Sequence, residues 1–322
     1  MKTLRIIAGL TFREAARRKI LLAAVAMGGG FLAVFAVGFY YASADIARNA
    51  NHMTQLAARE ARAFMVLAGL YVVNFLAVAM SALISLDTLS GEIQSGAIQT
   101  LVAKPVRRWQ VVLGKWIGFA GIMTLYLILM GGGVIAIGYA IAGSLPRGPA
   151  LGIALVWLNG MLMLSVSFFG GSRLSTLANG VLAFGLYGIA FVGGWVEQIG
   201  GVAQKHAAVN VGIVASLIFP SDALWRRAAW DMQSPLMTAI GVSPFASAHP
   251  PNAMMIGYAG LYALVAVALA IHASLEEDQR LRRELRLVLL QVLGEHDHLD
   301  LPPQVFERND AHLRAGIAAG LG

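Results

Sequence analysis

The sequence contains no cysteine, and only 13% of its residues are charged. The missing thiols exclude disulfide bonds, thiolate metal sites and cysteine nucleophiles. The charged fraction is about half of the ~25% that is usual in soluble domains, whereas 58% of the 322 residues are hydrophobic. A soluble globular domain is therefore excluded, and we expect an all-α integral membrane protein.

The sequence also lacks a nucleotide-binding loop. Glycines cluster at 28–30, 114–118 and 131–133, but none of these clusters precedes a Lys-Ser or Lys-Thr pair after a strand. The apolar runs hold serines without a deep histidine or aspartate, so we predict that the chain is not an enzyme. We also expect no carboxylate inside the spans, which argues against a carrier driven by protons or ions. The glycines instead allow membrane helices to approach closely.

Six apolar runs are each long enough to cross a membrane, for which about 20 residues suffice. The third run exceeds that length, so it is expected to tilt or to project from the bilayer. Lys and Arg concentrate before the first span, around the start of the third and after the sixth, so both termini are predicted to be cytoplasmic. The same bias explains the net charge of +7 without a nucleic acid partner. The predicted spans are about 20–41, 64–86, 111–141, 150–172, 177–199 and 253–273.

A basic, imperfectly amphipathic helix is predicted at residues 2–19, before the first span. Leu4, Ala8 and Phe12 share one face of it. We expect this helix to lie in the inner membrane interface, with its cations near anionic headgroups. A cleavable signal peptide is the alternative, because Ala-Ser-Ala at 42–44 follows the first apolar run. That run is longer than the ~7–15 residues of a signal-peptide core, which favours a retained span.

Residues 90–116 form the one long polar break between the second and third spans. Ile93, Ala97 and Leu101 recur every four residues and make one apolar face of a short predicted helix. Pro105 ends that helix. We predict an amphipathic helix on the membrane surface, where a soluble partner can push on it, with an ordinary cytoplasmic loop as the alternative.

Residues 200–252 form the longest outer segment. The apolar run 209–219 is too short to span a membrane, so it is expected to be re-entrant or interfacial. Pro220 and the residues after it predict the start of another helix. Trp225 and Trp230 on that helix suit the outer membrane interface.

These segments resemble the ABC-2 type permeases, the membrane subunits of ATP-binding-cassette exporters. The resemblance covers about residues 1–273 and rests on TFREA at 11–15, GEIQSG at 91–96, AKP at 103–105 and SLIFPSDALWRRAAW at 216–230. In that family an N-terminal elbow helix precedes the first span, and a coupling helix between spans 2 and 3 docks on the ATPase. The implied coupling residues are Glu92, Ile93, Gly96, Ala97, Leu101, Lys104, Pro105, Arg107 and Arg108. The implied elbow residues are Phe12, Arg13, Glu14, Arg17 and Arg18.

The resemblance implies a permease subunit that exports its substrate by alternating access in a prokaryotic cytoplasmic membrane. ATP and Mg²⁺ are then bound by a separate ATPase subunit, and no cofactor is expected on this chain. A second copy or a paralogue completes the dimer among the membrane lipids, and the path between the copies is lined largely by spans 2 and 5. Possible lining residues are Asn74, Ser81, Ser85, Asn159 and Asn179, with hydrogen bonding between helices as their alternative role.

Two other functions stay open, a non-transport scaffold that anchors an ATPase and transmits force, and a channel that works alone. Residues 1–274 are expected to form the membrane domain, and 275–322 a cytoplasmic helix and tail. No metal site is predicted. Met232, Met237 and Met254 suit packing better than copper(I) binding, and the histidines and aspartates of 296–300 suit a solvated tail.

Overall fold

A computed structural model of the chain describes residues 2–17, 19–49, 54–86, 108–234, 236 and 250–296. All regular structure in these ranges is α-helical. The chain divides into two compact units, residues 1–274 and 275–322. The helices are α1 (Lys2–Ala16), α2 (Lys19–Arg48), α3 (Gln55–Leu86), α6 (Arg108–Ala142), α7 (Pro149–Gly171), α8 (Thr176–Val202), α9 (His206–Ile218), α10 (Ser221–Met232) and α12 (Ala253–His296).

Among the described residues, six helices are long and apolar enough to cross a membrane, namely α2, α3, α6, α7, α8 and the Ala253–Glu276 part of α12. The six spans predicted from the apolar runs are therefore confirmed as helices. The largest difference is at α3, which begins at Gln55 instead of residue 64. Its additional residues, 55–63, include four alanines, two arginines and one glutamate, which favour a helix although the charged ones do not favour lipid.

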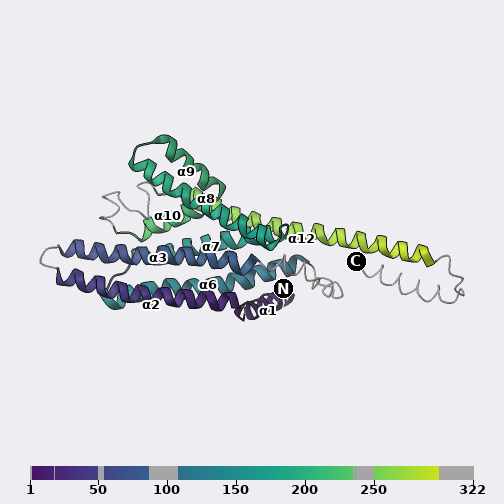
Figure 1. Cartoon of the computed structure of the whole chain (residues 1–322), viewed down its shortest axis with the longest axis horizontal. Coiled ribbons are helices and arrows are strands. Elements are labelled where there is room, and N and C mark those ends of the chain that lie inside the picture. The colour runs from purple at the N-terminus through teal and green to yellow at the C-terminus, as the bar shows by residue number, and fades with distance from the viewer. Residues whose placement is uncertain are drawn as a thin grey trace. The chain divides into compact units, whose positions relative to one another are not determined.

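The centre of the first unit is made by α3, α6 and α7, which run side by side with α2 along α3 and α6 (Figure 1). In α7, 72% of an 18-residue apolar stretch is buried inside the protein, whereas in α2 the corresponding share is 11%. Thus α7 is a core helix, whereas α2 leaves large apolar side chains such as Val34 exposed. In a membrane that exposed surface suits contact with lipid.

The helix predicted before the first span is present as α1, and it packs against α6 (Figure 1). Two glycines of α6 make the contact possible. A Cβ atom on Gly118 would lie 2.9 Å from the Ala8 carbonyl oxygen, and one on Gly114 would lie 2.8 Å from Ile7 Cγ2. The buried side of α1 centres on Thr11 and Ala15, which are 6% and 1% exposed. Its position at a membrane interface stays a prediction.

A hairpin of α8 and α9 projects from the bundle, and α10 follows it after a bend of 106° (Figure 1). The run predicted to be re-entrant or interfacial, 209–219, lies in α9, and the predicted helix start at Pro220 is confirmed by α10. Trp225 differs from the expectation of an interfacial side chain. It is only 2% exposed and packs on Tyr71, with ring centroids 5.1 Å apart.

Candidate functional site

The predicted coupling residues fall almost entirely within 87–107, which lies outside the described residues. Their role therefore stays a prediction. Of this set the structure places Arg108 at the start of α6. Among the elbow residues, Arg18 also lies outside the described part. Arg13 and Arg17 are exposed on or beside α1, and the Phe12 ring lies against Gly121 of α6.

The five possible lining residues are all buried, each no more than 2% exposed. Asn159 Nδ2 on α7 donates to Asn74 Oδ1 on α3 at 2.9 Å, and Asn179 Nδ2 donates to a backbone carbonyl of α7 at 2.9 Å. Ser81 and Ser85 donate to carbonyl oxygens of their own helix at 2.8 Å. The two asparagine bonds support the alternative of hydrogen bonding between helices, whereas the two serine bonds stay within α3. A lining role stays a prediction for all five residues.

The hydrogen bond between the side-chain amides of Asn159 and Asn74 leads to a stability prediction. Replacing each residue with alanine, singly and together, is expected to give a coupling free energy of about 0.6 kcal/mol, the average for hydrogen bonds between membrane helices, and no more than about 1.7 kcal/mol. Unfolding of the full chain in detergent measures the four free energies. The pair Asn74→Ala and Asn179→Ala is the control, because no hydrogen bond joins those side chains and their effects are expected to add. Additive effects in the bonded pair would contradict the prediction.

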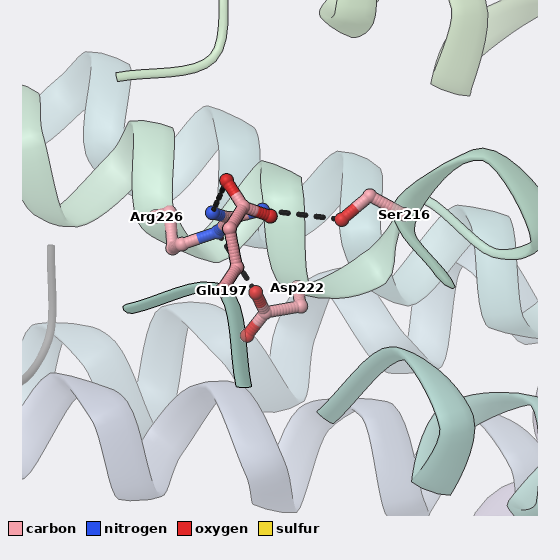
Figure 2. A network of polar contacts seen from close by, with 4 residues as sticks. All are labelled: Glu197, Ser216, Asp222 and Arg226. Carbon is pink, nitrogen blue, oxygen red and sulfur yellow. Dashed lines mark hydrogen bonds and ion pairs between the residues drawn. The ribbon is translucent and has the colours of Figure 1, made fainter. Parts of the chain in front are cut away.

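A buried ion cluster joins α8, α9 and α10 around Arg226 (Figure 2). Arg226 Nη1 lies 2.6 Å from Glu197 Oε1, and Arg226 Nε lies 2.8 Å from Asp222 Oδ2. Arg226 Nη2 donates to Ser216 Oγ at 3.1 Å. The arginine is 3% exposed, and the side chains of Glu197 and Asp222 are 17% and 13% exposed. One guanidinium group therefore ties three helices together.

This cluster corrects the expectation that no carboxylate lies inside the spans. Glu197 belongs to α8, one of the six candidate spans. The sequence indicates one contact of the cluster. Asp222 and Arg226 are four residues apart on a helix, a spacing that favours an ion pair. Glu197 and Ser216 give no comparable sign, because only the hairpin of α8 and α9 brings them to Arg226.

Two glycines make room for the two carboxylates. A Cβ atom on Gly194 would overlap both carboxylate oxygens of Asp222, and a Cβ atom on Gly212 would overlap Cβ of Glu197. Since no side chain fits at either position, the cluster depends on these glycines as well as on its charges.

The electrostatics of Asp222 reflect its burial. Asp222 lies in the first turn of α10, a position at which the helix dipole favours a negative charge. The helix α10 is not one of the six candidate spans. Burial raises the pKa of its carboxyl to about 6; the Arg226 guanidinium lowers that pKa, and the Glu197 carboxylate raises it. With both carboxyls ionised, two negative charges share one guanidinium, and the cluster carries a net charge of −1.

A small pocket adjoins the cluster between α3, α8 and α10. Its polar groups come from Asn74, Ser221 and Asp222. Its aromatic walls come from Tyr71, Tyr187, Phe191 and Trp225. The second and fifth spans, α3 and α8, thus border one polar pocket, and Asn74 is the predicted lining residue that reaches it.

The methionines considered for copper(I) do not share one environment. Met232 is 2% exposed and packs against Gly152, whereas Met254 is 82% exposed. Met237 and residues 297–300 lie outside the described part of the chain.

Six long apolar helices among the described residues are typical of a multi-pass membrane protein. The family model for the ABC-2 family transporter protein matches residues 5–279. The chain therefore belongs to this family and is an ABC transporter permease. One similar protein is the probable ABC transporter permease protein NosY of Stutzerimonas stutzeri, 33% identical over 97 residues. That match covers 30% of this chain and 33% of NosY, about a third of the relative's length.

Proposed function

We propose that this permease exports its substrate by alternating access and that ATP hydrolysis in a separate subunit drives it. The match to the ABC-2 family transporter over residues 5–279 carries the proposal. The small polar pocket between α3 and α8 agrees with it, because these are the second and fifth spans, which line the path in the resembling permeases. The sequence has no nucleotide-binding loop, so the energy has to come from a partner that binds ATP and Mg²⁺.

The contact with that ATPase is proposed for the coupling helix within 91–103, centred on Glu92. Arg107, Arg108 and Lys115 then anchor its far end at the membrane surface. Closure of two ATPase subunits around ATP would move this helix and switch the cavity between its inward- and outward-facing states. A second copy or a paralogue of the permease would complete the path.

A non-transport scaffold is the second candidate, because a subunit that anchors an ATPase and transmits force needs the same coupling helix. ATP-dependent uptake of a defined substrate into inverted vesicles separates the two functions. An exporter accumulates substrate inside inverted vesicles when ATP is added, and a scaffold does not. A channel that works alone would pass its solute without any ATPase.

The test of the ATPase contact is purification of the full chain from its native membrane in mild detergent. We expect an ATPase to copurify, and Glu92→Lys to lower its recovery by about tenfold or more, as for a central residue of an interface. Gln94→Lys is the control, since it also introduces a lysine into the same predicted helix, with a charge change of +1 instead of +2, and leaves Glu92 in place. Equal recovery with both variants would refute the docking role of Glu92, and the absence of any ATPase would refute the proposed exporter.

A further inference from the structure

The buried cluster of Glu197, Asp222 and Arg226 has one negative charge in excess. A charge that is removed from water needs a partner, because its desolvation costs several kcal/mol. Arg226 is already shared by both carboxylates. In Figure 2 one oxygen of Asp222 faces the guanidinium and the other points away from it. Asp222 also lines the pocket, so its carboxylate is available from the pocket side.

One further polar group of the pocket lacks a partner within the described residues. Ser221 Oγ is buried and makes no hydrogen bond there. Ser221 is only 1% exposed, and it lines the pocket beside Asp222. Its hydroxyl oxygen carries lone pairs that can coordinate a cation. Because buried polar groups are nearly always satisfied by protein, water or a ligand, Ser221 Oγ points to a guest beside Asp222.

The size and walls of the pocket restrict that guest. The cavity holds about 10 Å³, which is room for about one water-sized particle. The rings of Tyr71 and Trp225 pack on each other with centroids 5.1 Å apart, so they close one side of the pocket and leave no space for a larger guest between them. The described residues contain no group of three or more His, Cys, Asp or Glu, which argues against a multivalent metal ion. A single positive charge would balance the cluster.

We propose that this pocket binds one water-sized monovalent cation, an alkali ion or an ammonium group, between the Asp222 carboxylate, Ser221 Oγ and the aromatic walls. The bound cation neutralises the cluster that joins α8, α9 and α10. It thereby stabilises the attachment of the α8–α9 hairpin to α10. The inference concerns this chain alone and holds whether or not the permease exports its substrate.

The experiment is thermal unfolding of the full chain in nanodiscs at pH 7.5, followed by tryptophan fluorescence. Sodium, potassium, ammonium and methylammonium chloride each replace N-methyl-D-glucamine chloride at constant ionic strength. We expect at least one of these small cations to raise the unfolding midpoint by several degrees and to saturate, as mass action requires for a ligand of the folded state. The alkali and ammonium series identify which kind of cation fits.

Variants locate the effect in the pocket. Asp222→Asn is expected to abolish the cation-dependent shift, and Ser221→Ala to move the titration to higher concentration. Ser221→Ala leaves every ion pair of the cluster in place, so it provides the test even if Asp222→Asn does not fold. Asp231→Asn is the matched control, because Asp231 lies on the same helix, pairs with Arg227 and does not line the pocket. That control is expected to keep the full shift.

Three results would overturn the proposal. The first is an unfolding midpoint that depends on ionic strength alone. The second is a shift that is unchanged in Ser221→Ala and in any Asp222→Asn protein that folds. The third is full stabilisation by lowering the pH to 5.5 in N-methyl-D-glucamine, with nothing added by the small cations, since a proton would then neutralise the cluster.

Discussion

Replacing Arg226 with methionine is expected to lower the free energy of unfolding by about 3–5 kcal/mol, the usual effect of removing one partner of a buried ion pair. Methionine keeps much of the side-chain volume but leaves Glu197 and Asp222 without the guanidinium that both contact. Ser216 loses its donor as well. Two carboxylates then repel each other at the junction of three helices. Thermal unfolding and the yield of monodisperse chain in detergent measure the loss.

The neighbouring arginine is the control for this prediction. Arg227 pairs with Asp231 at 3.0 Å, but its side chain is 28% exposed, so Arg227→Met is expected to cost no more than about 1 kcal/mol. Neutralising all three charges, with Glu197→Gln, Asp222→Asn and Arg226→Met together, is expected to recover most of the stability. If Arg226→Met and Arg227→Met are equally mild, the cluster does not hold the hairpin.

Replacing Gly118 with leucine is expected to displace α1 from α6. The new side chain would meet the Ala8 carbonyl oxygen and Thr11 Cβ, which are 2.9 and 2.8 Å from the position of a Cβ at residue 118. Backbone cannot yield as a flexible side chain can, so the overlap costs about 1–3 kcal/mol. Since 1.4 kcal/mol is a factor of ten, the population with α1 detached rises by about fivefold to about a hundredfold.

The absence of cysteine allows a direct measurement of that detachment. Thr11→Cys introduces a single thiol into a chain without others, at a position that is 6% exposed while α1 is docked. Its labelling by a maleimide is expected to be about fivefold faster or more in the Gly118→Leu background. Gly132→Leu on the same helix is the control, because nothing lies within 4 Å of a Cβ there. Equal labelling rates in the two backgrounds would show that α1 does not depend on the glycine contact.

The spans could be predicted from the sequence because the information that defines them is local. A bilayer requires about 20 consecutive apolar residues, and each of the six runs supplies them without reference to any other part of the chain. The ends of the helices could not be predicted in this way, because hydropathy defines only the apolar part of each helix. The first turns of α3, from Gln55, are polar, and their helical state reflects residue propensity rather than hydropathy.

The buried cluster could not be predicted in the same way, because its parts come from three helices. Glu197 stands among apolar residues near the end of α8, where a single acid suggests an exposed helix end. Its contact with Arg226 exists only because α9 returns along α8 and α10 turns away from it (Figure 1). Gly194 and Gly212 permit the contact, yet in the sequence they are two among 36 glycines.

The bend between α9 and α10 also determines the parity of membrane crossings. At 1.5 Å per residue, the 13 residues of α9 and the 12 of α10 reach about 20 and 18 Å, short of the ~30 Å of bilayer hydrocarbon. With the pair bent by 106°, neither helix is long enough to cross alone, so the described residues hold six candidate spans, or seven if the bent pair forms one broken span. Six crossings would put the beginning of α1 and the Glu276 end of the last span in the same compartment, as the charge bias of the sequence predicts. A seventh crossing by α9 and α10 would place these two points on opposite sides of the membrane.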